Sequence, residues 1–323
     1  MESKLEDIGF YTLSDNRAKN SSEKSDLKRC EIVLTDKCNF KCPYCRGPIK
    51  ELEGETEFKE ASYVIDIWIK NNLESIRFSG GEPTQYPFLD LLVKQSKRGG
   101  IKNIAISTNG SACVEYYKYL IRCGVNDFSI SLDACCSSTG KTMCGGIEGM
   151  WEIVVDNIRE ISKLCYTTVG IVFTEDNINE VKNTIEFASS LGVSDIRIIS
   201  SSQFNGFCNT LNKIPTEIRK KHPILDYRIK NFLSNRNVRG IGKNDCHKCY
   251  LSLDDMTVLK GLHFPCIIYM REHGNPIGVV DENIRAERKD WFDRHNTYKD
   301  KICRENCLDV CIDYNNKANN GKI

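Results

Sequence analysis

The sequence predicts an α/β protein whose core is a partial (β/α)6 barrel of the TIM type, followed by a small cysteine-rich C-terminal domain. Short β-branched segments alternate with longer amphipathic ones along residues 31–199, which is the pattern of strand–helix units around a parallel sheet. Six such strands are present, whereas a closed barrel of this kind has eight. Six of the 17 cysteines lie between residues 246 and 311, and they mark off the C-terminal part.

The predicted strands are rich in Ile and Val, as expected of parallel strands that are covered on both faces. They span Glu31 to Thr35, Ser75 to Phe78, Asn103 to Thr108, Asp127 to Leu132, Tyr166 to Phe173 and Asp195 to Ile199. The helices predicted between them span Phe58 to Asn72, Phe88 to Arg98, Val114 to Cys123, Gly149 to Leu164 and Ile178 to Leu191. In such a fold the ligand site lies at the carboxyl ends of the strands.

The composition argues against several classes of partner. The chain carries 45 Lys and Arg residues against 44 Asp and Glu residues, so its overall charge gives no case for nucleic acid or an anionic membrane. No apolar run approaches the roughly 20 residues that a transmembrane helix needs. Seventeen cysteines without a signal peptide indicate a reducing compartment, and we expect a cytoplasmic protein.

Three cysteines, Cys38, Cys42 and Cys45, follow the first predicted strand. Thiolates are the usual ligands of four-iron clusters, which normally take four of them, so this trio would leave one iron open. A zinc site would need a fourth ligand. No histidine lies near this loop, and Cys30, at the start of the strand, would be roughly 16 Å away. The trio therefore predicts an iron–sulfur cluster.

A second motif, Ser79-Gly80-Gly81-Glu82-Pro83, follows the second predicted strand. Its paired glycines allow the backbone to approach a ligand closely, although such a segment alone is often an ordinary turn. The motif comes one strand–helix unit after the cysteine trio, and the aromatic Tyr44 precedes the last cysteine of that trio. This combination resembles the radical S-adenosylmethionine (SAM) superfamily.

The resemblance implies a specific cofactor arrangement. A [4Fe-4S] cluster would be held by the cysteine trio, and its open iron would chelate SAM. An electron from the cluster would then cleave SAM to a 5'-deoxyadenosyl radical. The residues implied to contact SAM here are Tyr44, Gly80, Gly81, Glu82 and Pro83. The chemistry implies a low-potential electron donor such as flavodoxin or ferredoxin, and an anaerobic or well-reduced cytoplasm.

Polar residues also end the third and fourth predicted strands, namely Ser107, Asn109, Ser131 and Asp133. Their hydroxyl, amide and carboxylate groups can bond a ribose or a methionyl carboxylate, and the resemblance places them near SAM. Helix capping or turn formation is the alternative. Contacts to adenine would fall near Gly170, Ile171 and Ile199.

The C-terminal cysteines are Cys246, Cys249, Cys266, Cys303, Cys307 and Cys311. The order Cys249, Gly261, Cys266, followed by a trio, resembles the SPASM extension or its shorter twitch form, which implies an auxiliary [4Fe-4S] cluster. The spacing of the last trio departs from the full SPASM pattern, so we expect one auxiliary cluster rather than two. Zinc is the alternative, because the pair Cys246 and Cys249 is close to a zinc-ribbon spacing.

A further group, Cys135, Cys136 and Cys144, comes directly after Asp133. A thiol beside a radical could donate a hydrogen atom or form an adduct, which makes Cys135 and Cys136 candidate catalytic residues. The alternative is that they pack as small apolar side chains.

We predict four parts in the chain: an N-terminal extension (1–29), the radical SAM core (30–205), a basic linker or helical segment (206–245) and the auxiliary-cluster domain (246–323). Eight basic residues and one acidic residue lie between residues 219 and 243. They would either contact phosphate groups or form a solvated surface.

The substrate is open to three interpretations. The SPASM resemblance implies modification of a peptide or protein, which is our first expectation. A nucleotide or small-molecule rearrangement, as in the molybdopterin-precursor cyclase family, is the second, because that family also has a paired cysteine and a downstream cysteine. A non-catalytic iron–sulfur or zinc protein is the third.

Overall fold

A nine-stranded sheet forms the centre of the computed structural model, which describes residues 15–47, 53–201, 208–234, 236 and 239–321. The strand order is β6-β5-β4-β3-β2-β1-β7-β8-β9. The six predicted strands form one parallel block: β1 (Arg29–Val33), β2 (Ser75–Ser79), β3 (Asn103–Thr108), β4 (Asp127–Ser131), β5 (Tyr166–Phe173) and β6 (Asp195–Ser200). The α/β fold and the partial barrel are thereby confirmed.

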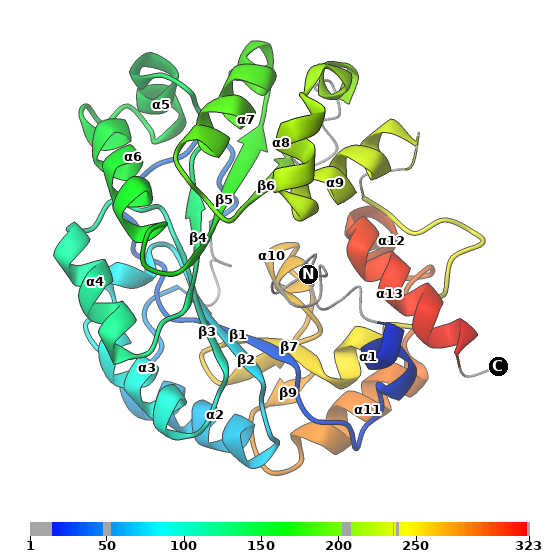
Figure 1. Ribbon diagram of the computed structural model, residues 1–323. Coiled ribbons are helices and arrows are strands. Elements are labelled where there is room, and N and C mark those ends of the chain that lie inside the picture. Colours follow the sequence, from blue (N-terminus) through cyan, green and yellow to red (C-terminus); the bar gives the residue numbers. More distant parts are fainter. Residues whose placement is uncertain (1–14, 48–52, 202–207, 235, 237–238, 322–323) are drawn as a thin grey trace.

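Helices follow one another around the outside of these strands (Figure 1). They are α2 (Phe58–Lys70), α3 (Leu89–Arg98), α4 (Val114–Cys123), α5 (Ser137–Met143), α6 (Met150–Ile161) and α7 (Val181–Ser190). Each of the longer helices turns an apolar stripe inward, because residues three or four positions apart share one face. Trp68, Phe78 and Phe128 are completely buried where helices meet the sheet.

The C-terminal part extends the same sheet, which the sequence did not predict. Strand β7 (Asp255–Leu259) pairs in parallel with β1, with Arg29 opposite Asp255. Strands β8 (Leu262–Phe264) and β9 (Gly278–Val279) then add antiparallel. All five residues of β7 are buried, so its pattern lacks the alternation that identifies a half-exposed strand.

Helix α9 (Pro223–Leu233) packs on β6, at the other edge of the sheet, and α8 (Thr216–Lys221) packs on α9. Helices α10 (Ile267–Arg271), α11 (Ile284–Arg294) and α12 (Lys301–Asn306) belong to the C-terminal part. Helix α1 (Asp15–Asn20) packs on α13 (Asp309–Asn320), so that the first and last described helices are neighbours (Figure 1). The described 3-10 turns are η3 (Pro83–Gln85), η4 (Ile178–Glu180), η5 (Cys208–Lys213) and η6 (Tyr250–Leu253). The predicted boundary at residues 205 and 206 lies outside the described residues. None of the described helices is long and apolar enough to cross a bilayer.

A buried ion-pair group joins α1 to the sheet. Arg17 of α1 bonds Asp254 at 2.9 Å and also pairs with Asp255, and the side chains of all three residues are almost fully buried. Burial raises the pKa of Asp254, while Arg17 opposes that shift. The cation therefore compensates two adjacent acids inside the protein.

We expect Arg17→Leu to lower the free energy of unfolding by about 3 to 5 kcal/mol, because it leaves the buried Asp254 without its ion-pair partner, while Asp255 keeps, among the described residues, only Arg29 at 3.8 Å. Lys19→Ala on the exposed side of the same helix should change it by less than about 0.5 kcal/mol. Urea unfolding of both variants measures the difference. Equal midpoints would show that the ion-pair group does not fix α1 to the sheet.

A candidate cofactor and substrate cavity

A cavity of about 450 Å³ opens at the carboxyl ends of the parallel strands. Its wall combines the loops after β1 to β4 with residues of β5, β6, α9, α10 and α13. Most of the predicted site residues line it, namely Cys38, Cys42, Tyr44, Cys45, Gly80, Gly81, Ser107, Asn109, Ser131 and Asp133, and so do Gly170 and Ile199. Glu82, Pro83 and Ile171 are buried and are not part of the wall.

The cysteine loop presents its sulfurs as hydrogen-bond acceptors. The backbone N–H of Phe40 donates to Cys38 Sγ at 3.4 Å, and that of Gly47 donates to Cys45 Sγ at 3.4 Å. A turn closes between Cys45 N and Cys42 O at 3.0 Å. Burial raises the pKa of the Cys38 thiol, and the hydrogen bond from Phe40 opposes that shift. The thiolate is the form that binds a metal.

The thiol chemistry fits a multi-iron cluster better than a single ion. Burial raises the pKa of the Cys42 thiol to about 12, and Asp133 and Cys45 add to the shift. Three thiolates there would need positive charge to balance them, which bound iron supplies. The three sulfurs do not all lie within 4.8 Å of one another, whereas the thiolates of one tetrahedral zinc ion are about 3.8 Å apart.

The paired glycines touch the backbone just before the cysteine trio. Gly81 N donates to Thr35 O at 2.7 Å. A Cβ on Gly81 would lie 2.4 Å from Lys37 O and 2.6 Å from Asp36 O, and one on Gly80 would lie 2.5 Å from Thr35 O. Only glycine fits this approach, so the Gly-Gly segment sets the position of the cysteine loop.

Glu82 forms hydrogen bonds to other residues of the protein. It is completely buried, and its Oε1 accepts hydrogen bonds from Thr84 N at 3.0 Å and Thr108 Oγ1 at 2.7 Å. Its Oε2 accepts one from Asn109 N at 2.7 Å. Burial raises the pKa of Glu82, and these donors oppose the shift. The carboxylate thus joins the ends of β2 and β3, while its predicted contact with SAM stays a prediction.

Asp133 links the fourth strand end to the cysteine loop. Its Oδ2 accepts from Tyr44 Oη at 2.5 Å, and its Oδ1 accepts from Val172 N at 2.6 Å. Burial raises the pKa of Asp133 to about 6, although both hydrogen bonds oppose the shift. Asn109 supports the same loop from the third strand end, because its Nδ2 donates to Asn39 Oδ1 at 2.8 Å.

Arginines give the cavity its charge. Against two carboxylic acids, Glu31 and Asp133, the wall carries six arginines: Arg29, Arg77, Arg197, Arg228, Arg239 and Arg271. Behind the wall, Asp255, Asp127 and Asp309 form ion pairs with Arg29, Arg77 and Arg228, respectively. Burial lowers the pKa of Arg197 to about 10, and the neighbouring arginines Arg77 and Arg228 add to the shift. An anion in this cavity would relieve that repulsion.

Hydroxyl groups hold two of these arginines in place. Arg77 Nη1 donates to Ser107 Oγ at 2.8 Å, and Arg197 Nη2 donates to Ser129 Oγ at 2.9 Å. Among the described residues, the Nε atoms of Arg77 and Arg197 are buried without a hydrogen-bond partner. Both side chains therefore keep donor capacity for a ligand.

Sequence analysis missed these arginines, although a signal was present. Arg77 and Arg197 each lie between two apolar residues within β2 and β6, where a charge needs a partner or a function. Residues of the basic segment 219–243 lie in two different places, on the cavity wall and on the exposed surface. Arg228 and Arg239 line the cavity, whereas Lys230 pairs with Asp226 at an exposed site.

Five of the six C-terminal cysteines converge. Each of Cys249, Cys266, Cys303, Cys307 and Cys311 has its pKa shifted by at least one other thiol of this five-thiol group. Burial raises the pKa of Cys266 to about 11, and Cys311 adds to the shift. Cys246 differs, because its pKa is raised by burial and Asp245 without a contribution from a thiol. Cys311, Ile267 and Ile268 line the same cavity as the first trio.

The structure separates the three cysteines that follow the fourth strand. Cys144 lines the cavity, whereas Cys135 and Cys136 do not. Their thiols lie instead beside Glu180. A catalytic role for Cys135 and Cys136 finds no support in their position.

Comparison with known proteins identifies the class. Residues 32–188 match the family model of the radical SAM superfamily. The chain is 27% identical over 215 residues to a probable GTP 3',8-cyclase from Metallosphaera sedula, which covers 61% of this chain and 67% of that protein. It is 23% identical over 313 residues to a GTP 3',8-cyclase from Aquifex aeolicus, which covers 88% of this chain and 96% of that protein.

Solved structures share the fold. The anSMEcpe structure with bound AdoMet aligns with a TM-score of 0.63 at 16% identity and covers 83% of this chain and 82% of that chain. Streptococcus suis SuiB bound to its precursor peptide SuiA aligns with a TM-score of 0.57 at 16% identity, covering 87% of this chain and 66% of that chain. At these identities the likeness shows the fold alone.

The chain contains a radical SAM domain, and the domain implies a [4Fe-4S] cluster and SAM as cofactors. The protein is therefore an enzyme with a radical SAM domain over residues 32–188, as the cysteine trio and the Gly-Gly-Glu-Pro segment indicated.

We expect Gly81→Ala to reduce cluster loading, because its Cβ would displace the backbone at Asp36 and Lys37. The iron content of the reconstituted protein should fall by about four atoms per chain if that one cluster is lost. The matched control is Gly170→Ala, whose Cβ would meet nothing closer than 3.9 Å. Full iron loading of Gly81→Ala would refute this role of the glycine.

Proposed function

We propose that the protein is a radical SAM enzyme that transforms a nucleoside triphosphate, with GTP as the first candidate. The observation that carries the proposal is the excess of arginine over carboxylate on the cavity wall. Guanidinium groups bind phosphate oxygens through paired hydrogen bonds, and a triphosphate supplies enough negative charge to balance several of them. The names of the relatives point to the same substrate.

Peptide modification, the first expectation from the sequence, has weaker support. The likeness to SuiB is one of fold, and a wall with six arginines favours a polyanion over an uncharged peptide backbone. The nucleotide interpretation therefore takes precedence.

Different residues of the same cavity would bind the cofactors and the substrate. The cysteine trio and the strand ends beside it would hold the cluster and SAM, and the bound cofactors supply the radical chemistry. The arginines of β2, β6, α9 and α10 would bind the phosphates. Residues Ile267 and Ile268 of α10 add apolar surface, which excludes water from the reacting atoms.

We further propose that the five-thiol group holds an auxiliary [4Fe-4S] cluster. Four thiolates complete such a cluster, and five are present. Because Cys311 also lines the cavity, this cluster would lie within reach of the substrate.

The first test of the function is turnover. The anaerobically reconstituted enzyme, given SAM, a low-potential reductant and GTP, should form 5'-deoxyadenosine together with a rearranged nucleotide, both detected by liquid chromatography and mass spectrometry. A small panel of peptides serves as the comparison. The proposal would be overturned if SAM were cleaved at the same rate with and without GTP and no nucleotide product formed.

A binding test isolates the phosphate contacts. GTP should bind the enzyme more tightly than guanosine, and Arg271→Ala should weaken GTP binding about tenfold, which is about 1.4 kcal/mol. Arg271 is an exposed residue at the end of α10, so its loss should leave the fold intact. Arg98→Ala, on the outer helix α3, is the control. Equal affinity for GTP and guanosine in calorimetry would contradict a phosphate site.

Iron content tests the auxiliary cluster. The reconstituted protein should contain about eight irons per chain, and the triple variant with Cys249, Cys266 and Cys311 changed to Ser should keep about four. A matched triple variant with Cys113, Cys123 and Cys246 changed to Ser should keep all eight. Four irons in the unaltered protein, together with one zinc that is lost from the first triple variant, would instead make the C-terminal group a zinc site.

A further inference from the structure

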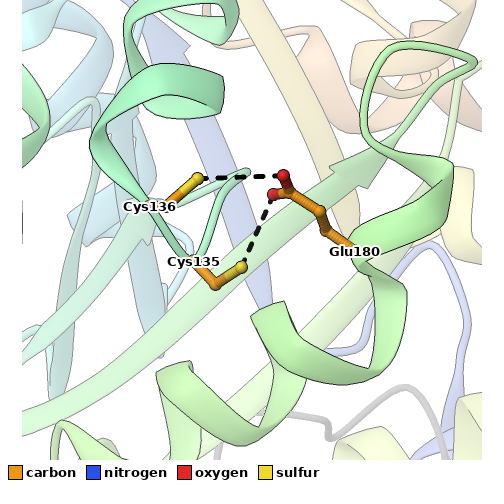
Figure 2. Close-up of side chains that lie close together, drawn as sticks. All are labelled: Cys135, Cys136 and Glu180. Atoms are coloured by element: carbon orange, nitrogen blue, oxygen red, sulfur yellow. Dashed lines mark hydrogen bonds between the residues drawn. The ribbon is translucent and has the colours of Figure 1, made fainter.

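A second group of metal-binding side chains lies outside the cavity. Cys135 and Cys136 follow β4, and Glu180 ends η4, which comes after β5. Figure 2 shows both thiols turned toward the Glu180 carboxylate. The Cys135 thiol donates to Oε2 at 3.5 Å, and the Cys136 thiol donates to Oε1 at 3.7 Å. One ligand atom from each residue lies within 4.8 Å of the other two.

We propose that Cys135, Cys136 and Glu180 form a Zn²⁺ site that is separate from the iron–sulfur chemistry. With Zn–S bonds of about 2.3 Å and Zn–O bonds of about 2.1 Å, tetrahedral geometry places sulfur and oxygen about 3.6 Å apart. The two sulfurs lie 3.5 and 3.7 Å from different oxygens of Glu180, and one ligand atom of each residue lies within 4.8 Å of the other two, so the three ligands would draw closer together around zinc. Two thiolates and a carboxylate are ligands that zinc accepts, and a water molecule would complete the shell.

The surroundings of Glu180 favour a cation. Its carboxylate is half-buried, and no Lys or Arg of the described chain forms an ion pair with it. Thr139 Oγ1 donates to Glu180 Oε1 at 2.6 Å and thereby orients the carboxylate. Hydrogen bonds of this kind to a ligating group are typical of metal sites.

The thiols also have supporting partners. Cys136 Sγ lies 3.3 Å from Ser138 Oγ and 3.5 Å from Thr139 Oγ1. On the other side, the Thr184 hydroxyl is completely buried beside Cys135 and has no nitrogen or oxygen partner among the described residues. This hydroxyl can donate to a Cys135 thiolate once zinc has displaced the thiol proton.

The position of the site suggests a structural role. Zinc there would tie the loop after β4 to η4, two segments that already meet where Asn177 Nδ2 donates to Asp133 O at 2.8 Å. Helix α5 begins directly after Cys136, and its residues Gly140 and Met143 line the cavity. A metal at this point would therefore stabilise the position of α5 on the cavity wall without contacting the substrate.

Metal analysis of the full-length, cluster-loaded protein tests the proposal. After expression with added Zn²⁺, the protein should contain about one zinc per chain. Cys136→Ser and Glu180→Gln should each weaken zinc retention at least about tenfold against a chelator, with iron content unchanged. Cys113→Ser and Glu186→Gln are the matched controls, because Cys113 is exposed and Glu186 pairs with Lys182.

X-ray absorption at the zinc edge gives an independent readout, and two sulfur neighbours at about 2.3 Å with the rest oxygen are expected. Three or four sulfur neighbours would assign the zinc to the C-terminal thiols and overturn the proposal. A protein free of zinc would also overturn it, as would zinc that persists in both Cys136→Ser and Glu180→Gln.

Discussion

The parallel pairing of β7 with β1 is the constraint on which the functional arrangement depends. Strand β1 leads into the cysteine trio, and β7 runs beside it in the same direction, with Arg29 opposite Asp255 and Val33 opposite Leu259. Parallel strands end at the same edge of a sheet. Strand β8 is antiparallel to β7, so Cys266, which follows β8, lies toward the amino ends of β1 and β7. Arg29, at that end of β1, affects the pKa of both Cys266 and Cys311. The cavity reaches from the trio to Cys311, so two cysteine groups more than 200 positions apart in the chain adjoin one cavity.

Arginine side chains repel one another on the cavity wall. Burial and neighbouring cations lower the pKa of Arg197 and of Arg239 to about 10, so these charges are less stable here than in water. Several neighbouring arginines are stable in a folded protein only where other interactions hold them in place. The hydroxyl groups of Ser107 and Ser129 and the carboxylate of Asp127 do so for Arg77 and Arg197. A polyanionic ligand would add negative charge beside these arginines.

Local features were predictable from the sequence, and those that depend on distant contacts were not. The six strands, the cysteine loop and the Gly-Gly segment have short-range signals in periodicity and turn residues. Strand β7 was missed because all its residues are buried and its partner β1 lies far away in the sequence. The sequence also grouped Cys144 with Cys135 and Cys136, but the helix α5 between them turns Cys144 into the cavity and leaves the other two with Glu180. Likewise, no spacing rule separates Cys246 from the five-thiol group.

The packing of α1 on α13 has a consequence for biosynthesis. The first trio and the contacts that position its loop, which reach as far as the hydrogen bond from Lys41 N to Cys144 O, are complete once residues 35–144 have been made. The five-thiol group is complete only when Cys307 and Cys311 have left the ribosome and α13 has docked on α1. Because folding proceeds from the N-terminal side during synthesis, the trio is assembled before the C-terminal thiols have met. If both groups hold clusters as proposed, the trio can receive its iron while the chain is still being made, and the C-terminal group cannot.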